Sequence, residues 1–116
     1  MSKKIEDFVP PLTLCKLIPA GKFENSVLGY TPAGIVVLSE TFPVKWFAPT
    51  LEEIMGEMAK NPRYFNNGYC EIDGDGFIVG AHLPNLGKPG STLVEYRDKN
   101  GATAALKLFL HDRRKK

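Results

Sequence analysis

The segment Asp73-Gly74-Asp75-Gly76 is the part of the sequence that most resembles a metal-binding loop. A calcium loop of the EF-hand type needs oxygen ligands at its first, third and fifth positions, glycine at the sixth and glutamate at the twelfth. Counted from the start of this segment, the fifth, sixth and twelfth positions hold Phe77, Ile78 and Pro84. Apolar strand patterns also flank the segment where the calcium motif requires helices. The pattern therefore predicts a hairpin turn and no metal site.

The glycines of the same region do not form a nucleotide-binding loop. Gly74, Gly76 and Gly80 have a spacing one residue longer than that of the dinucleotide fingerprint. A strand pattern follows them, whereas a bound phosphate needs the N-terminus of a helix. We expect no cofactor.

Two histidines and two cysteines, His82, His111, Cys15 and Cys70, are the remaining candidates for catalysis or metal binding. Neither histidine has a second ligand at a metal-binding spacing. The cysteines are far apart in a chain without a signal-peptide pattern, so we expect reduced, buried thiols. His111 is expected on a solvated stripe. A small enzyme that uses His82 or a cysteine for catalysis is an alternative, but we expect a protein that is not an enzyme.

The segment from Phe42 to Pro49 is unusually aromatic and follows neither a strand nor a helix period. Phe42, Trp46 and Phe47 are therefore candidate interaction residues, because exposed aromatic side chains in loops mark partner sites. The alternative is that Trp46 and Phe47 fold down over the core beside the helix that follows.

The basic residues of the chain are concentrated at its end, in Arg113, Arg114, Lys115 and Lys116. The sequence holds 15 Lys and Arg against 13 Asp and Glu, and without these four it holds 11 against 13. Cations at the C-terminus of a helix are favoured by its exposed carbonyl groups. They would also attract nucleic acid weakly and without sequence preference. Because the rest of the chain is mildly acidic, we favour the first explanation, and nucleic acid is an unlikely partner.

Two helices are expected, at about 50–60 and 102–113. Thr50-Leu51-Glu52-Glu53 fits the capping box that begins a helix, and Asn61-Pro62 ends it. Asn100 is a good N-cap for the second helix, whose apolar residues cover about two thirds of its circumference. Such a helix is buried on more than one side, so we expect it to be the central packing element.

Strand patterns occupy most of the remaining sequence. Short runs at 27–30 and 35–38 flank a Pro/Gly turn, and the second run, apolar on both faces, is expected in the interior of a sheet. Runs at 69–73, 77–82 and 92–96 predict an antiparallel meander. The fold class is therefore α+β, with one antiparallel sheet of about five strands and two main helices packed against it.

The length of 116 residues predicts one domain. We assign residues 1–9 to a flexible leader, with one or two helical turns after Pro11, residues 10–112 to the domain and 113–116 to the basic tail. No apolar run approaches the roughly 18 residues that span a bilayer, so a cytoplasmic protein without membrane contact is expected.

Three segments resemble a type of small hypothetical protein of bacterial phages and prophages. These segments are Leu14-Cys15-Lys16-Leu17-Ile18-Pro19-Ala20-Gly21-Lys22-Phe23, Ala48-Pro49-Thr50-Leu51-Glu52-Glu53-Ile54 and Asn100-Gly101-Ala102-Thr103-Ala104-Ala105-Leu106-Lys107-Leu108. Similar proteins carry the patterns LCKxIPxGxF, PAPTLxEI and NPADAALKLW, from which this chain departs at Phe47 and Gly101. The layout also resembles, more weakly, the phage α-β-α sandwich domains. The resemblance implies a phage accessory protein and supplies no functional residues.

The sequence therefore leaves three functions open. The first is a non-enzymatic module that binds a protein partner of the phage or its host. The second is weak nucleic-acid binding through residues 113–116, and the third is the small enzyme named above. The identity of a partner and the oligomeric state do not follow from the sequence.

Overall fold

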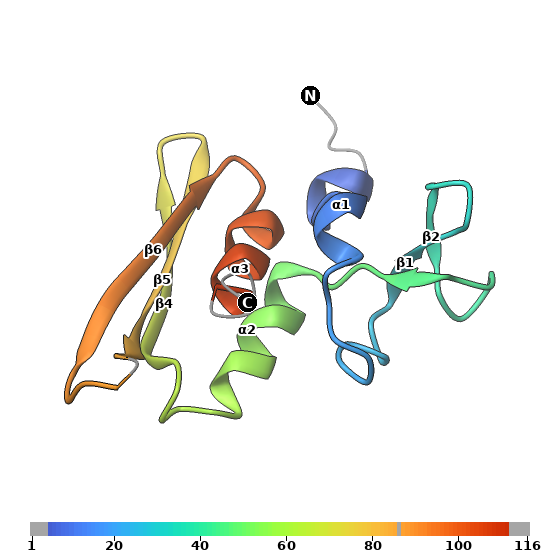
Figure 1. The fold of residues 1–116 in the computed structure, drawn as a ribbon. Coiled ribbons are helices and arrows are strands. Elements are labelled where there is room, and N and C mark those ends of the chain that lie inside the picture. The colour runs from blue at the N-terminus through green and yellow to red at the C-terminus, as the bar shows by residue number, and fades with distance from the viewer. Residues whose placement is uncertain (1–4, 86, 112–116) are drawn as a thin grey trace.

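The computed structural model describes residues 5–85 and 87–111 (Figure 1). The fold is α+β, as predicted, but the strands form two antiparallel three-stranded sheets instead of one sheet of five strands. The elements in chain order are η1 (Ile5–Phe8), α1 (Leu12–Cys15), β1 (Leu28–Tyr30), β2 (Val36–Leu38), β3 (Trp46–Phe47), α2 (Leu51–Ala59), β4 (Asn66–Asp73), β5 (Gly76–Pro84), β6 (Ser91–Asp98) and α3 (Gly101–Phe109). In Figure 1 the larger sheet, the helices α3 and α2, and the small sheet follow one another across the molecule.

The larger sheet is the predicted meander, in the order β4-β5-β6. Strand β5 alternates, and Val79, Ala81 and Leu83 on one face are buried. The turn between β4 and β5 is the hairpin expected from the glycines, because Asp73 pairs with Gly76 and Gly74 has a φ of 63°. Glycine adopts this conformation without strain. The segment that resembled a calcium loop is therefore a two-residue turn.

Helix α3 is the central packing element, as predicted, and it packs against β5, β6 and α2. Every residue from Gly101 to Leu110 is buried except Lys107. Asn100 caps the helix, since its side chain accepts a hydrogen bond from the Thr103 backbone N–H at 3.1 Å. Thr103, a polar residue within this mostly apolar helix, is also buried, at 6% exposed. The helix ends at Phe109, earlier than the predicted residue 113, and residues 112–116 lie outside the described part of the chain.

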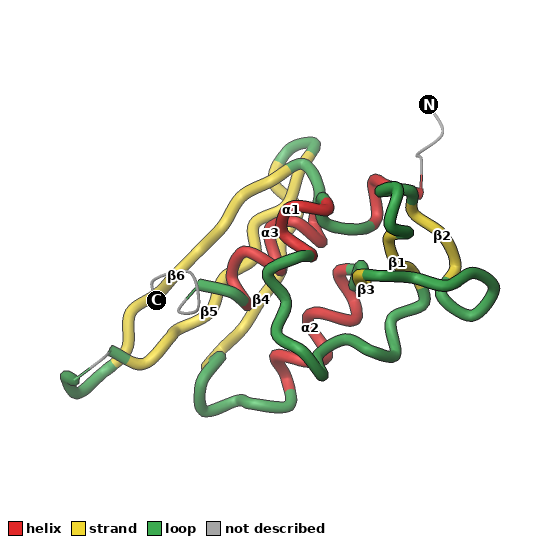
Figure 2. Tube along the Cα trace, turned by 45° about the vertical axis from the view of Figure 1, so that its right-hand side comes forward, coloured by secondary structure: helices red, strands yellow, loops and turns green. Residues whose placement is uncertain are grey.

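Helix α2 begins where the capping box predicts. The Glu53 backbone N–H donates to the Thr50 hydroxyl at 3.3 Å, and the Thr50 backbone N–H donates to the Glu53 carboxylate at 2.9 Å. Ile54 and Met58 of the predicted apolar face are buried, and the helix packs on α3. Figure 2 shows α2 between the large sheet and the small one.

The small sheet, in the order β2-β1-β3, is the main departure from the expected fold. Strand β1 pairs with β2 on one side and with Trp46 and Phe47 on the other. Both edges of β1 are therefore occupied by nearby segments, and no edge remains through which it could join the larger sheet. Strand β3 was not predicted from the sequence, because a strand of two residues between prolines is too short to show an alternating pattern.

The interior position expected for residues 35–38 is wrong. Strand β2 is an edge strand, in which Val36 is buried while Leu38 is 45% exposed; Ile35, just before it, is 60% exposed. An apolar run without alternation is typical of a strand buried on both faces. Here the same run lies at a sheet edge and leaves apolar side chains in water.

Part of the segment assigned to a flexible leader belongs to the folded structure. Residues Ile5–Phe8 form the 3₁₀ helix η1, and Val9 is 1% exposed. The Asn100 side-chain amide donates to the Val9 carbonyl at 2.7 Å, which joins the start of the chain to the start of α3. Residues 1–4 lie outside the described part of the chain.

One cluster of buried side chains, from Val9 to Leu110, connects the two sheets and the helices. It explains how short strands persist beside the larger sheet, since their buried residues Leu28, Tyr30 and Val36 belong to the same core. Within residues 5–85 and 87–111, no helix has the length and apolar character needed to cross a membrane.

Candidate functional site

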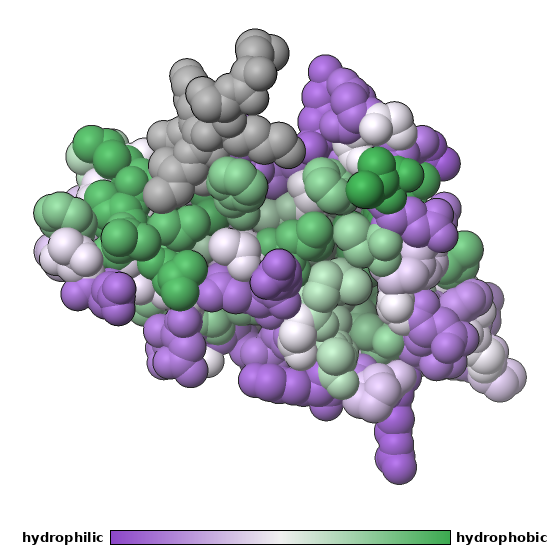
Figure 3. Space-filling model, turned by 180° about the vertical axis from the view of Figure 1, so that it is seen from behind, coloured by the Kyte–Doolittle hydropathy of each residue, from purple (hydrophilic) through white to green (hydrophobic). Residues whose placement is uncertain are grey.

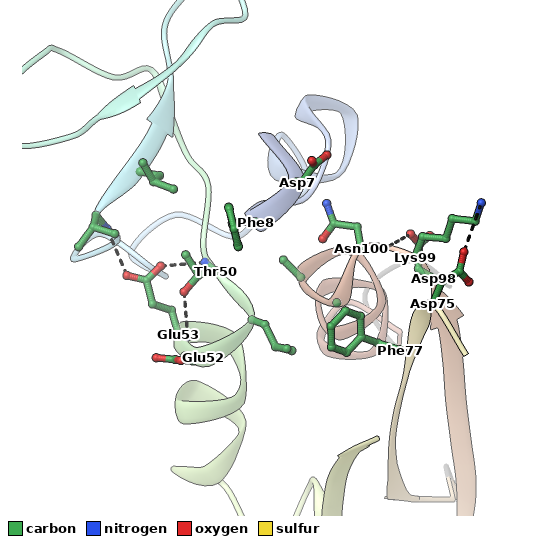
Figure 4. A pocket seen from close by; sticks show the side chains of 15 residues that line it. Asp7, Phe8, Thr50, Glu52, Glu53, Asp75, Phe77, Asp98, Lys99 and Asn100 are labelled. Carbon is green, nitrogen blue, oxygen red and sulfur yellow. Dashed lines mark hydrogen bonds and ion pairs between the residues drawn. The ribbon is translucent and has the colours of Figure 1, made fainter. Parts of the chain in front are cut away.

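A groove of about 860 Å³ lies where the N-termini of α2 and α3 approach each other (Figure 4). Residues of η1, the start of β1 and the β4–β5 turn complete its lining. Figure 4 shows Phe8 between the two helix N-termini, with Thr50 and Glu53 on one side and Asn100 and Phe77 on the other. The groove thus joins five segments that are far apart in the sequence.

The capping residue Glu53 builds one side of this groove. Besides the capping box, its second carboxylate oxygen accepts a hydrogen bond from the Val27 backbone N–H at 3.1 Å. This bond fixes the start of the small sheet against the first turn of α2. Glu53 is therefore committed to holding the groove together.

Asn100 and Gly101 build the opposite side. The Asn100 backbone N–H donates to the Asp98 carboxylate at 2.9 Å, and its side chain holds Thr103 and Val9 as described above. A Cβ atom at Gly101 would lie 2.9 Å from Leu51 Cδ2 and 3.2 Å from the Phe77 ring. The absence of a side chain there allows the start of α3, α2 and β5 to meet closely.

The groove exposes large apolar side chains. Phe8 is 51% exposed and Val27 is 56% exposed, although both line a concave surface next to the core. Leu28 beside Val27 pairs with the exposed Leu38 of β2, and the backbone N–H of Phe42 donates to the Leu38 carbonyl at 3.0 Å. Val27, Leu38 and Phe42 therefore lie on neighbouring segments of the small sheet, and all three side chains are exposed. Figure 3 shows apolar surface gathered on the side of the molecule that carries this sheet.

The charged groups that line the groove are mostly acidic. They comprise Asp7, Glu52, Glu53, Asp75, Asp98 and Lys99, so five carboxylates against one ammonium group give a formal charge of −4. Asp98 also approaches Lys107 at 3.7 Å. Asp75 lies 3.9 Å from Lys99, and both side chains are more than four fifths exposed. An exposed pair of this kind contributes little free energy, so Asp75 stays available to a ligand.

The three aromatic candidates from the sequence lie in different environments. Trp46 and Phe47 form β3 and are half-buried against the core, as in the alternative in which they cover it. Lys16 and Lys45 lie over the Trp46 ring, 4.8 and 4.9 Å from its centroid. Phe42 is 53% exposed and lies beside Leu38. Of the three, Phe42 is the most accessible and best fits the expected interaction residue.

The described structure does not bring His82 together with a cysteine. Cys70 pairs with Val79 across the sheet, and His82 is three residues further along β5, so the two side chains point to opposite faces. Cys15 is buried, with its thiol 3.6 Å from the Pro10 carbonyl, and burial raises its pKa to about 12. Cys70 is exposed rather than buried as predicted, since it lies in β4, an edge strand whose side chains are mostly exposed. Partial burial still raises its pKa.

His111 and the basic residues complete the candidates from the sequence. The expected solvated position of His111 is wrong, since it is half-buried and its Nδ1 lies 2.7 Å from the Tyr96 hydroxyl. The tail, Arg113, Arg114, Lys115 and Lys116, lies outside the described residues. In residues 5–85 and 87–111, no three His, Cys, Asp or Glu side chains gather closely enough to bind a metal ion.

Sequence reasoning missed the residues that make the groove, namely Phe8, Val27, Glu52, Asp75 and Phe77. The caps Thr50 and Asn100 were recognisable, so the two helix N-termini were known. Nothing in the sequence indicated that they meet, because that depends on contacts such as Asn100 to Val9, which are 91 residues apart.

Comparison with known proteins found no family model that matches the chain, and no similar protein among the curated proteins or the solved structures.

Proposed function

We propose that this protein is a non-enzymatic interaction module that binds a segment of a protein partner in the groove between the N-termini of α2 and α3. The observation that carries the proposal is the exposure of Phe8 and Val27 within a groove of about 860 Å³. Concave apolar surfaces that remain in water are the usual binding sites of folded domains. A protein segment with one or two large apolar side chains fits such a surface.

The positions of the reactive groups favour binding over catalysis. A cysteine nucleophile needs a base within hydrogen-bond reach, and His82 and Cys70 lie on opposite faces of the large sheet. Cys15 is shielded by the core. In the groove itself, Glu53 and Asp98 hold a cap and a turn, and much of the remaining lining is apolar.

The phage resemblance described above supports a more specific role. A small accessory protein of a phage or prophage acts in the bacterial cytoplasm by binding a host or phage protein. The genes next to this one test that role, since a phage origin predicts phage structural, replication or lysis genes beside it.

A matched pair of substitutions tests the groove as the binding site. Val27→Asp introduces a charge into the groove, while Leu93→Asp does so at a leucine that is 45% exposed on the large sheet, outside the groove. Proteins retained from a bacterial lysate are identified by mass spectrometry, and binding is repeated with both purified proteins. Val27→Asp is expected to abolish binding and Leu93→Asp to preserve it. Equal binding by both variants would refute the groove as the site.

A further inference from the structure

We infer that the partner segment is cationic, with lysine or arginine side chains on either side of its apolar anchors. This inference rests on the proposed function and names the chemistry of the partner. It follows from the arrangement of charge around the apolar floor of the groove.

Four of the five carboxylates that line the groove, all except Asp7, fall into two groups. Glu53 and Asp98 accept hydrogen bonds from backbone N–H groups and hold the local structure. Glu52 and Asp75 have no such role. In the described part of the chain the Glu52 side chain makes no hydrogen bond or ion pair, and the Asp75 carboxylate has only an exposed ion pair with Lys99 at 3.9 Å. These two carboxylates are therefore available for ionic contacts with a ligand.

Glu52 and Asp75 come from different segments of the lining. Glu52 belongs to the first turn of α2 and Asp75 to the β4–β5 turn, and Figure 4 shows Glu52 on the outer side of α2 and Asp75 beside Lys99, at opposite ends of the groove lining. A segment that lies across the groove would thus have a carboxylate at each end of the lining, within reach of long side chains. Lysine and arginine next to a large apolar residue satisfy both requirements at once.

Helix stability explains only part of this acidity. Acidic residues in the first turn of a helix are favoured by the positive end of its dipole, which accounts for Glu52 and Glu53. Asp75 lies in a turn between strands, where neither the α2 nor the α3 dipole requires it. The acidity of the groove therefore exceeds what the two helices need.

The formal charge of −4 also indicates which kinds of ligand the groove favours and which it repels. It repels nucleic acid and acidic peptides, and it attracts cationic segments at a distance, most strongly at low salt. The chain itself ends in Arg113, Arg114, Lys115 and Lys116, so the tail of this chain or of a second copy is a competing occupant. It carries no large apolar residue, and we expect it to bind less tightly than an amphipathic segment.

The test uses a fluorescent amphipathic peptide of leucine and lysine, and a matched peptide with glutamine in place of lysine. Binding to the full chain is measured by fluorescence anisotropy at low and moderate salt. The lysine peptide is expected to bind at least about tenfold more tightly at low salt, with a difference that shrinks as salt rises. Equal affinities for the two peptides would overturn the inference.

Charge reversal locates the contact. The variant Glu52→Lys/Asp75→Lys is compared with Glu24→Lys/Glu71→Lys, which changes the net charge equally at exposed glutamates outside the groove. The first is expected to lower the affinity for the lysine peptide about tenfold more than the second. Equal losses would mean that only net charge attracts the peptide and would refute the site. Circular dichroism of both variants checks that they fold.

A chain ending at His111 tests the competing occupant. If its affinity for the lysine peptide rises more than about tenfold over that of the full chain, the tail occupies the groove and the inferred partner is wrong. Unchanged affinity supports the inference. This inference can fail while the proposed function holds. If both peptides bind equally well and Val27→Asp abolishes the binding of both, the groove is the binding site but its partner need not be cationic.

Discussion

The two halves of the molecule bury their large apolar side chains to different extents. Residues 50–111 form strands of eight or nine residues and helix α3, and among those that the structure describes only two large apolar side chains are exposed, Ile72 and Leu93. Residues 5–49 form strands of two or three residues. Of the eight large apolar side chains exposed in the described part of the chain, six belong to this half, namely Phe8, Leu17, Val27, Ile35, Leu38 and Phe42.

The difference shows what a short strand can and cannot do. A long strand that alternates buries one face completely, as Val79, Ala81 and Leu83 of β5 do. A three-residue strand at an edge buries one side chain and leaves its neighbours in water, as β2 does with Val36 and Leu38. Exposed apolar surface therefore accumulates on the small sheet and beside the groove, where we propose that a partner binds.

The largest expected effect tests whether the two halves open together. Each half carries one cysteine, and Cys15 is buried while Cys70 is exposed. Burial raises the pKa of the Cys15 thiol to about 12, so near pH 8 it holds very little thiolate, the reactive form. Cys70 should react with a disulfide reagent at least about a thousandfold faster than Cys15.

The control for this measurement is the rate of global unfolding. If Cys15 reacts only as fast as the whole chain unfolds, the halves form one cooperative unit. A faster reaction would mean that residues 5–49 open alone.

The raised pKa of the Cys15 thiol also has a consequence for stability. Ionisation of Cys15 favours the unfolded chain, so its contribution is intact below about pH 9 and is lost as pH rises toward 12. Cys15→Ala should remove this alkaline loss.

The next largest effect compares a leucine from each half. Leu106 in α3 is fully buried, whereas Leu38 in β2 is 45% exposed. Leu106→Ala should lower the free energy of unfolding by about 2–5 kcal/mol, because it leaves a cavity in the core. Leu38→Ala should change it by less than about 1 kcal/mol. Urea unfolding measures both, and a large loss for Leu38→Ala would contradict the picture of a partly uncovered small sheet.

The features that the sequence predicted depend on neighbours a few residues apart. The capping box at Thr50, the cap at Asn100 and the Gly74 turn are local arrangements, and the structure confirms all three. The burial of α3 followed from its composition for a similar reason, since apolar residues around most of a helix require cover on several sides.

The features that the sequence did not predict depend on distant contacts. The third strand of the small sheet exists because Trp46 and Phe47 pair with Gly29 and Tyr30, not because two residues have a strand period. The groove needs Val27 against Glu53 and Val9 against Asn100. The sequence alone does not reveal these pairings and gave no reason to place Phe8 beside the β4–β5 turn, so the candidate site could not be predicted.

A smaller effect concerns the bond that joins the halves. The Glu53 side chain accepts hydrogen bonds from Thr50 and from Val27, while the side chain of its neighbour Glu52 makes none in the described structure. Glu53→Ala should cost about 1–3 kcal/mol of unfolding free energy, since a charged acceptor and a helix cap are lost. Glu52→Ala should cost less than about 0.5 kcal/mol. Equal losses would mean that the cap does not couple the small sheet to α2.

The smallest expected effect is a gain in stability at Gly56 of α2. No atom would lie within 4 Å of a Cβ built there, and the residue lies in the interior of a helix. Gly56→Ala should therefore raise the free energy of unfolding by about 0.5–1 kcal/mol, because alanine loses less backbone entropy on folding. The reverse change, Ala59→Gly at an exposed position of the same helix, should lower it. If Gly56→Ala is neutral or destabilising while Ala59→Gly behaves as expected, then α2 bends or moves at Gly56 and is not the rigid wall of the groove.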